Sequence, residues 1–420
     1  MNPLSGAAQA ARLRRDWLQT RAKVLRPALR TLELRTEVRP ARGAVLLSYM
    51  TEAFALQDGT FPAPHTNLWE CREIARTYLE LGYDVDVVNY RNFLFTPRRH
   101  YDLVIDTRNN LERLAPLLDD DCIRVHHIEV QHLLFQNAAE FDRLVDLQQR
   151  RGVSLQPRRV ERRTNLAIEH ADLGVLYGGR HAAQRWAYAG KPLYPVPGTP
   201  IRTFDRPVEK DVDRVRNRFV FLSSGGLVLR GLDLVLEAFA ELPDCHLTVC
   251  GPIDDEPDFR AAFHRELFET PNITTLGWVD VTGPQFEALM RDTIGLVYPT
   301  ASDAQSGSVI TAMHAGLIPI MTPAAGIDAP ADAAVVLQEA SVASIRSAVG
   351  ELAARSTDEL RQAADRAWTY ARSTHTRSRF AAAYRELAAG LVGDAPMPRP
   401  VHVPTATVSD DEADAVGLRR

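Results

Sequence analysis

The sequence feature that most constrains the fold is the segment of residues 294–326, IGLVYPTASDAQSGSVITAMHAGLIPIMTPAAG. An apolar run, Ile294–Tyr298, leads into a polar loop, a helix is expected to begin near Ser308, and a second apolar run follows at Leu317–Met321. Strand, loop, helix and strand in this order predict a βαβ unit of a parallel sheet. The loop would lie at the carboxyl end of a strand, where ligands bind in open α/β sheets. Free N–H groups at the start of the helix would suit a phosphate group.

Two series of alternating strands and helices extend over most of the chain. They occupy residues 43–197 and 214–357, and a segment rich in proline and charge, residues 198–213, separates them. This alternation predicts an α/β fold with parallel, doubly wound sheets in two Rossmann-like domains. The expected strands are 44–49, 85–90, 101–106, 123–129, 173–177, 219–223, 247–250, 273–276, 294–298, 318–322 and 335–337. The expected helices are 65–81, 138–151, 157–171, 232–242, 258–269, 283–291, 308–315 and, as one or two long helices, 358–390.

The two ends of the chain differ from the rest in composition. Residues 1–42 contain ten Arg and Lys residues against three acidic ones, and apolar residues recur at helical spacing, which predicts an amphipathic helix with a basic face. Such a helix can lie on anionic lipid as a peripheral membrane contact, or it can pack on the protein body with solvated arginines. Residues 391–420 are rich in proline and then in acids, and we expect them to be disordered.

Charge, cysteine usage and hydropathy argue against several classes of function. A net charge of −5 and a pI near 6.2 give no general attraction to nucleic acid. The four cysteines are scattered, as expected for free thiols in a reducing cytoplasm, and no His/Cys cluster predicts a metal site. No apolar run reaches the ~18 residues of a membrane span, and no apolar core follows the first basic residues, so we expect neither a membrane anchor nor a secretory signal. The loop after the first strand lacks GxGxxG, which argues against a dinucleotide-dependent oxidoreductase.

A spaced motif in residues 303–320 leads to a known family. Asp303 is followed by seven residues and then by Thr311. The next positions of the motif are Ala312, Met313, Gly316, Pro319 and Ile320. This segment resembles the donor site of GT-B glycosyltransferases, specifically the retaining nucleotide-sugar family 4, also called glycosyl transferases group 1. In that family an acidic residue, seven spacers and a Glu lead into AMAxGxPVI, so Thr311 is a departure from the pattern.

The resemblance implies the GT-B fold, in which two Rossmann-like domains face each other across a cleft. Residues 43–197 would bind the acceptor, residues 214–357 would bind the nucleotide-sugar donor, and the helices of 358–390 would cross back onto the first domain. The resemblance also implies a cytoplasmic glycosyltransferase of bacterial polysaccharide biosynthesis. Such an enzyme moves a hexose from a nucleotide-diphosphate sugar to a hydroxyl of a glycan or glycolipid, with retention, without a metal and with no cofactor beyond the donor substrate.

Two loops are candidates for binding the diphosphate of the donor. The first, residues 223–231, joins a strand to a helix; its glycines let backbone approach an anion, and Arg230 could bind phosphate with two hydrogen bonds. Arg230 stands where the relatives carry Lys, whereas Gly226 or Leu227 stands where they carry Arg, so one phosphate cation is absent or comes from elsewhere. In the second loop, the resemblance assigns Asp303 to the sugar hydroxyls. The candidate donor-site residues are Gly225, Gly226, Arg230, Gly251, Asp303, Gly307, Ser308 and Thr311.

On the acceptor side, the resemblance implies a histidine that follows a strand of the first domain and lies close to the sugar, and the candidates are His126, His127 and His132. His126 and His127 point to opposite faces of their strand, so at least one of them is expected in the core. His132 follows the strand and leads into a loop, which suits a residue that faces a cleft. We therefore rank His132 first and His127 second on the acceptor side, and Arg230 and Asp303 complete the candidate catalytic set.

Six arginines lie in three pairs between the two halves of the first series. They are Arg150/Arg151, Arg158/Arg159 and Arg162/Arg163. Two interpretations stay open: a solvated helical face paired with nearby acids, or a basic rim for an anionic acceptor.

The missing Glu at position 311 also leaves alternatives open. The protein is a divergent but active enzyme, an enzyme with an altered donor, or an inactive relative that binds a glycan or nucleotide or acts as a scaffold. We favour the first because the rest of the motif keeps its spacing. A sugar-nucleotide epimerase with the same fold is a further alternative.

Overall fold

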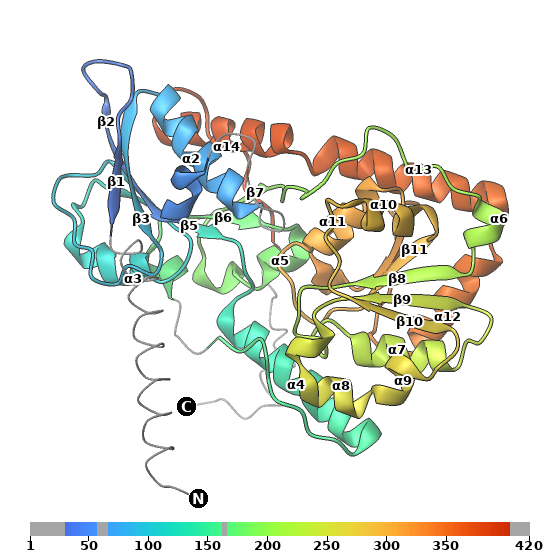
Figure 1. Cartoon of the computed structure of the whole chain (residues 1–420). Coiled ribbons are helices and arrows are strands. Elements are labelled where there is room, and N and C mark those ends of the chain that lie inside the picture. The colour runs from blue at the N-terminus through green and yellow to red at the C-terminus, as the bar shows by residue number, and fades with distance from the viewer. Residues whose placement is uncertain (1–29, 57–65, 162–165, 404–420) are drawn as a thin grey trace, which may run out of the picture.

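The computed structural model describes residues 30–56, 66–161 and 166–403, which form two α/β domains placed side by side (Figure 1). Each domain is built on a largely parallel sheet covered by helices, which confirms the expected fold class. Every strand expected from the apolar runs is present, with ends shifted by at most a few residues. Helices cover both faces of a parallel sheet, so its strands are buried on both sides and appear in the sequence as continuous apolar runs.

The first domain contains a seven-stranded sheet in the order β1-β3-β2-β4-β5-β6-β7. Its strands are β1 (Thr31–Leu34), β2 (Gly43–Tyr49), β3 (Tyr83–Asn89), β4 (Leu103–Asp106), β5 (Ile123–Ile128), β6 (Leu173–Tyr177) and β7 (Leu193–Val196). β1, which was not expected from the sequence, pairs antiparallel with β3. The predicted basic helix rests on residues 13–29, which lie outside the described residues, so it stays a prediction. β7, which contains Pro195, is not among the strands expected from the sequence. It lies at the edge of the sheet, where proline is tolerated.

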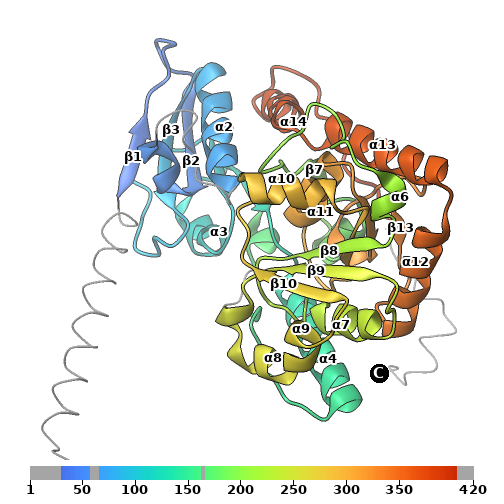
Figure 2. The ribbon, with the colours of Figure 1, turned by 45° about the vertical axis from the view of Figure 1, so that its right-hand side comes forward.

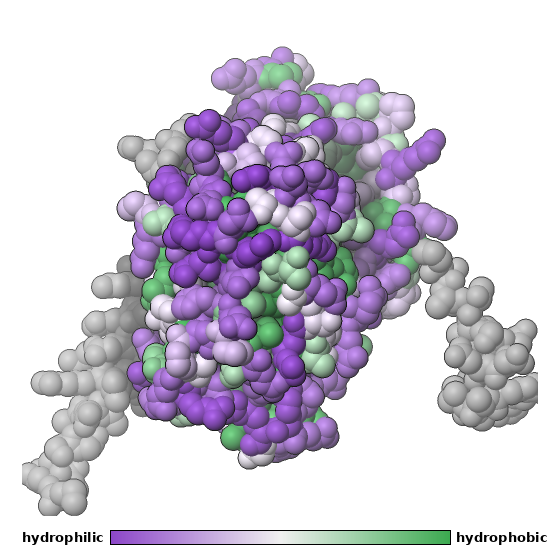
Figure 3. All heavy atoms as spheres, turned by 90° about the vertical axis from the view of Figure 1, so that its right-hand side faces the viewer, coloured by the Kyte–Doolittle hydropathy of each residue, from purple (hydrophilic) through white to green (hydrophobic). Residues whose placement is uncertain are grey.

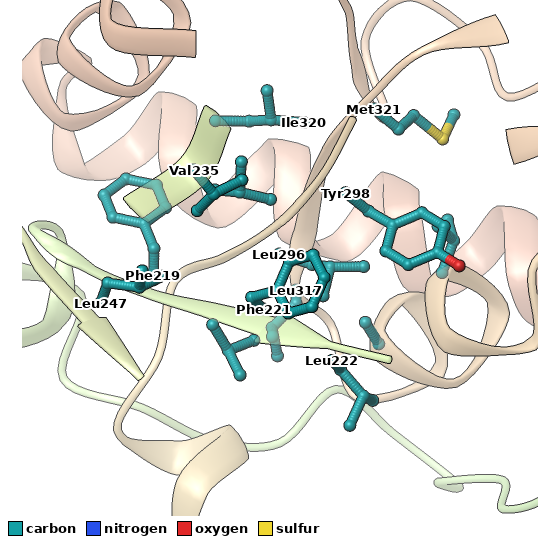
Figure 4. Close-up of a cluster of buried hydrophobic side chains, with 14 of the residues drawn as sticks. Phe219, Phe221, Leu222, Val235, Leu247, Leu296, Tyr298, Leu317, Ile320 and Met321 are labelled. Atoms are coloured by element: carbon teal, nitrogen blue, oxygen red, sulfur yellow. The ribbon is translucent and has the colours of Figure 1, made fainter. Parts of the chain in front are cut away.

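The second domain contains a six-stranded parallel sheet in the order β10-β9-β8-β11-β12-β13. Its strands are β8 (Arg218–Leu222), β9 (His246–Cys250), β10 (Ile273–Gly277), β11 (Gly295–Tyr298), β12 (Ile318–Met321) and β13 (Val335–Val336). β8 and β11 lie at the centre, where Phe219, Phe221 and Leu296 are fully buried (Figure 4). This core holds the carboxyl ends of β8 and β11 in place, and the two loops predicted to bind phosphate start at those ends.

Most of the expected helices are present. In the first domain the expected helices are α2 (Asn67–Glu80) and α4 (Leu133–Arg151), and the structure adds two short helices that were not expected, α3 (Asn110–Leu114) and α5 (Arg180–Gln184). After α6 (Val212–Val215), the second domain contains α7 (Leu232–Ala240), α8 (Pro257–Ala262), α9 (His264–Phe268), α10 (Pro284–Arg291), α11 (Gly307–His314) and α12 (Val342–Ala354). The helix expected over residues 157–171 is wrong: its described part is irregular except for a short 3-10 helix, Ala167–His170.

Two long helices, α13 (Thr357–Thr374) and α14 (Arg377–Leu391), return the chain to the first domain (Figure 2). α13 packs on α11, and α14 packs on α2. α14 contributes Phe380 and Tyr384 to the core of the first domain, where the ring of Phe380 meets Trp69 edge to face. The crossing of the C-terminal helices, expected from the resemblance, is therefore confirmed.

The segment after α14 corrects the expectation of a disordered tail over residues 391–420. Asp394 forms an ion pair with Arg42 at 2.6 Å, and the N–H of Val401 donates to the carbonyl of Leu193 in β7 at 2.7 Å. These contacts attach residues 394–401 to the first domain and give the edge strand β7 a backbone partner. Residues 404–420 lie outside the described residues.

The surface of the second domain is mixed in character. On the side seen in Figure 3, hydrophobic residues are scattered among hydrophilic ones. Within the part of the chain that the structure describes, no helix has the length and apolar character needed to cross a bilayer.

Candidate functional site

A cleft of about 600 Å³ lies between the two domains, at the carboxyl ends of the strands of both sheets. Both domains contribute polar side chains to its wall, as expected for a ligand site at this edge of α/β sheets. The lining residues from the first domain and the segment after β7 include Thr66, Asn67, Glu70, Arg108, Glu129, Arg159, Tyr177, Gly198 and Thr199. Those from the second domain include Ser223, Ser224, Arg230, Gly251, Trp278, Tyr298, Asp303, Gly307, Ser308 and Thr311.

Arg230 is the cation at the centre of the second-domain wall. It ends the loop between β8 and α7 and is 6% exposed. Its guanidinium lies 2.7 Å from a carboxylate oxygen of Asp303 and donates to the carbonyl of Ser302 at 2.6 Å. The next residue, Gly231, has a φ of +83° and lies against Pro299, so a glycine is required for the turn that places Arg230. The structure therefore brings the two strongest sequence candidates, Arg230 and Asp303, into direct contact.

Asp303 is fixed by several partners besides Arg230. The hydroxyl of Tyr298 donates to Oδ2 of Asp303 at 3.1 Å, and the N–H of Ala304 donates to Oδ1 at 3.1 Å. The side chain of Gln131, from the first domain, donates to the backbone carbonyl of Asp303. In this structure Asp303 thus holds Arg230 in place, and its predicted contact with sugar hydroxyls stays a prediction.

The N-terminus of α11 faces the same cleft. The helix begins one residue earlier than expected, and Ser306 rather than Ser308 is its cap, with the Val309 N–H donating to Ser306 Oγ at 3.4 Å. Gly307 and Ser308 line the cleft, as predicted. Thr311 also lines it, but its hydroxyl donates to the carbonyl of Gly307 at 2.7 Å, so this donor is already used within the helix.

The glycine turn at residues 225–226 does not present its amide groups as expected. The N–H of Gly226 donates to the carboxylate of Glu256 at 2.6 Å, and the N–H of Leu227 donates to the same carboxylate at 3.2 Å. Both glycines have a positive φ, and neither lines the cleft. Ser223, Ser224 and Gly251 form this part of the cleft wall. The predicted contact of Gly225 and Gly226 with a diphosphate is therefore not available in this structure.

The histidines of the acceptor side lie elsewhere than predicted. His126 and His127 occupy opposite faces of β5, as expected, and both are fully buried. Burial lowers the pKa of His126 to about 3 and that of His127 to about 4, so both are neutral. His132 caps α4, accepts the N–H of Leu134 at 3.4 Å and packs between the rings of Trp186 and Tyr188. None of the three histidines lines the cleft, and the geometry gives His132 a structural role at the start of α4.

The first-domain wall instead carries charged residues, of which Glu70, at the start of the first helix, was expected from the sequence to lie where an acceptor approaches, whereas Arg108 and Glu129 were not. Arg108 forms an ion pair with Glu129 at 2.9 Å, and Glu129 also accepts the hydroxyl of Tyr49 at 2.7 Å. Glu70 accepts the hydroxyl of Thr199 at 2.6 Å, and its second carboxylate oxygen is buried with no hydrogen-bond partner among the described residues. A weak sequence signal was available: Glu129 and Arg108 directly follow buried strands, at their carboxyl ends.

Glu70 leads to a prediction about the pH dependence of stability. Burial raises the pKa of Glu70 from 4.5 to about 7. The folded state then holds this proton more tightly than the unfolded state, so the contribution of Glu70 to stability is fully present below pH 4.5 and is lost as the pH rises through 7. The difference between the two pKa values corresponds to about 3 kcal/mol. We expect Glu70→Gln to remove this fall in the free energy of unfolding between pH 5 and 8.

Urea denaturation at a series of pH values measures the effect. Glu80→Gln, on the exposed side of the same helix, is the matched control and should keep the wild-type pH profile. Parallel profiles of wild type and Glu70→Gln would contradict the prediction.

Three of the four described residues of the arginine pairs are bound to acids of the second domain, so they form neither a solvated face nor a free basic rim. Arg150 and Arg151 form ion pairs with Asp233, Glu237 and Glu266 of the second domain, and Arg158 forms one with Asp258. Arg159 lines the cleft. Arg162 and Arg163 lie outside the described residues.

A family model matches the part of the chain that forms the second-domain wall of the cleft. Residues 216–355 match the family of glycosyl transferases group 1. The matched segment carries Arg230, Asp303 and α11, so this domain is similar to glycosyl transferases group 1. No curated protein matches the sequence significantly.

The whole fold is similar to solved structures of low sequence identity. HepE from Anabaena, solved in complex with UDP and glucose, has a TM-score of 0.51 at 12% identity over 84% of this chain and 100% of that chain. Sucrose-phosphate synthase from Thermosynechococcus elongatus has a TM-score of 0.58 at 14% identity over 84% and 99%. The N-terminal domain of trehalose-6-phosphate phosphatase from Candida albicans has a TM-score of 0.55 at 10% identity over 86% and 99%. These likenesses show the GT-B fold.

Proposed function

We propose that this protein is a glycosyltransferase that moves a hexose from a nucleotide-diphosphate sugar to a hydroxyl group of a glycan or glycolipid. The observation that carries the proposal is the meeting of Arg230, Asp303 and the N-terminus of α11 in one cleft, within the segment that matches glycosyl transferases group 1. A guanidinium and free amide groups at a helix start are the groups that bind phosphate best in proteins. The presence of UDP and glucose in the HepE structure supports a nucleotide-sugar as the donor class.

Catalysis in this proposal is electrostatic and geometric. When the bond between the anomeric carbon and the diphosphate breaks, the leaving oxygen gains negative charge, and Arg230 with the amide groups of Gly307 and Ser308 would stabilise it. Asp303 would orient Arg230 and bind hydroxyls of the transferred sugar. The proposal assigns no protein carboxylate as nucleophile and assigns the neutralisation of the diphosphate to these groups rather than to a metal, with retention at the anomeric carbon.

The acceptor would enter along the first-domain wall. Thr66, Asn67 and Glu70 lie at the start of α2 and offer hydrogen bonds to a molecule rich in hydroxyl groups. On the opposite side, Trp278 is 56% exposed at the cleft and offers an aromatic face to the nucleotide base or to a sugar ring.

A panel of UDP-, GDP-, ADP- and dTDP-hexoses tests the proposal. We expect saturable binding of one donor class to the wild-type protein and slow release of the matching nucleoside diphosphate, because water can replace a missing acceptor. Calorimetry measures the binding, and a coupled assay measures the released diphosphate. A folded protein that binds no donor in the panel would overturn the proposal.

A second candidate is a GT-B protein that binds a nucleotide-sugar without transferring it. Two observations favour it: Glu256 occupies the amide groups of Gly226 and Leu227, and position 311 lacks the carboxylate of the family motif. The same panel separates the two candidates, because a binding protein would take up a donor and release no diphosphate even with glycan acceptors present.

A further inference from the structure

Arg159 belongs to a segment that leaves its own domain. The α4 arm, defined here as residues 133–161, comprises α4 and the loop that follows it, between β5 and β6 of the first domain. In Figure 1 it lies under the second domain beside α8. Leu147 of the arm is fully buried in the core of the second domain, and Leu144 packs against the same core. The arm is thus part of the first domain by sequence order and part of the second by packing.

Ion pairs between the domains fix the position of the arm. Asp233 of α7 is fully buried and receives hydrogen bonds from Arg143 at 2.9 and 3.0 Å and from Arg150 at 2.6 Å. At the far end, the N–H of Gln156 donates to Asp258 of α8 at 2.9 Å. The loop that carries Arg159 is therefore attached to the donor side of the cleft.

The backbone of Arg159 is held by two residues of α4. Its N–H donates to the carboxylate of Glu140 at 3.2 Å, and its carbonyl accepts from Gln136 Nε2 at 2.8 Å. The same Gln136 accepts the hydroxyl of Ser302 at 2.6 Å, next to Asp303. Arg159 is thus connected through one side chain to the loop that holds Arg230.

The side chain of Arg159 uses the space that Gly226 leaves free. A Cβ atom at Gly226 would lie 2.4 Å from Cγ of Arg159, so any larger residue at this position would displace the arginine. From there Arg159 reaches the cleft that Arg230 also lines, and it is exposed to the solvent of that cleft. The space that a side chain at residue 226 would occupy is therefore filled by Arg159 of the α4 arm.

Arg159 and Arg230 place two like charges on the same part of the cleft wall. Asp303 forms its ion pair with Arg230, and among the described residues no carboxylate forms an ion pair with Arg159. Desolvation by the surrounding protein atoms, and then the charge of Arg230, lower the pKa of Arg159. The two guanidinium groups repel each other across this part of the cleft wall, and an anion bound between them would relieve that repulsion.

We infer that Arg159 is a second cation of the donor site and binds the diphosphate of the nucleotide-sugar together with Arg230. This inference rests on the proposed function. In this inference, the phosphate cation that is missing from the second domain comes from the first domain. Arg159 reaches the donor site because the α4 arm packs on the second domain. The affinity for the donor then depends on the α4 arm as well as on the second domain.

The test compares Arg159→Gln with Arg158→Gln. Both variants remove one guanidinium from neighbouring positions, but Arg158 pairs with Asp258 and does not line the cleft. The probes are UDP, GDP, ADP and dTDP with their nucleosides, titrated by calorimetry, and a melting curve of each variant checks the fold. We expect Arg159→Gln to weaken diphosphate binding by at least about tenfold and to leave nucleoside binding unchanged. Arg158→Gln should bind the diphosphate as wild type does, and Arg159→Lys should restore part of the affinity.

The possible failures are distinguishable. If wild type binds a nucleoside diphosphate, Arg230→Ala loses it and Arg159→Gln keeps it, the proposed function stands and the inference about Arg159 is overturned. If Arg159→Gln weakens the nucleoside and the diphosphate equally, the role of Arg159 is structural and the inference is also overturned. If the folded wild-type protein binds none of the probes, both the proposed function and the inference fail.

Discussion

Replacing Arg230 with alanine is expected to reduce the release of nucleoside diphosphate from the donor by at least ~100-fold, the usual effect of removing one preorganised group that stabilises charge in a transition state. Arg230 is buried, held by Ser302 and Asp303, and directed at the cleft, so it needs no reorganisation when negative charge develops on the diphosphate. The loss should appear in kcat more than in KM, because the negative charge on the leaving oxygen is greatest in the transition state.

The fold should survive the Arg230→Ala change. Asp303 keeps the hydroxyl of Tyr298 and the N–H of Ala304 as partners, so its carboxylate is not left alone. Arg260→Ala is the matched control, since Arg260 lies in the same domain, pairs with the exposed Asp254 and does not line the cleft. Equal rates for Arg230→Ala, Arg260→Ala and wild type would remove Arg230 from the mechanism.

The second large effect is expected on stability, from Asp233→Ala. This residue is fully buried between the domains, and its carboxylate binds both Arg143 and Arg150. Removing one partner of a buried ion pair leaves unpaired charge, which costs about 3–5 kcal/mol. We expect the lower end, about 3 kcal/mol, because Arg150 keeps Glu237 and Asp146 as partners and is partly exposed.

Urea denaturation at pH 7 measures the free energy of unfolding of Asp233→Ala. The control is Glu241→Ala, in the same domain, where both Glu241 and its partner Arg346 are exposed and the loss should stay within about 1 kcal/mol. Because Asp233 fixes the α4 arm, its removal should also weaken nucleoside diphosphate binding if Arg159 contacts the donor. Similar unfolding curves for the two variants would show that the arm is not held by this ion pair.

The sequence could not predict these ion pairs, although it did show the arginines. From the sequence, the expected partners of Arg150 and Arg151 are acids nearby in the chain or an anionic acceptor. The actual partners, Asp233 and Glu266, are 83 and 115 residues away. Charge partners so distant in sequence depend on where a helix docks, and α4 docks on the other domain.

The histidines illustrate the same limit at the level of single side chains. The alternation of side chains along a strand correctly places His126 and His127 on opposite faces, because this alternation is a local property of the backbone. Whether a residue after the strand faces a cleft is not local. Trp186 and Tyr188 enclose the ring of His132, while Glu129, three residues earlier, reaches the cleft.

What the sequence by itself determined is the architecture and the donor-side motif. Buried parallel strands need continuous apolar runs and their helices need amphipathic spacing, so the two sheets follow from residue order. The crossing of the C-terminal helices was expected only from the family resemblance, which the motif at Asp303–Thr311 carries. Only the tertiary structure decided which groups meet in the cleft. It pairs Arg230 with Asp303, turns the amide groups of residues 226 and 227 towards Glu256, and brings Arg159 over Gly226. These contacts join segments far apart in the chain, and their geometry depends on how the domains and the α4 arm pack.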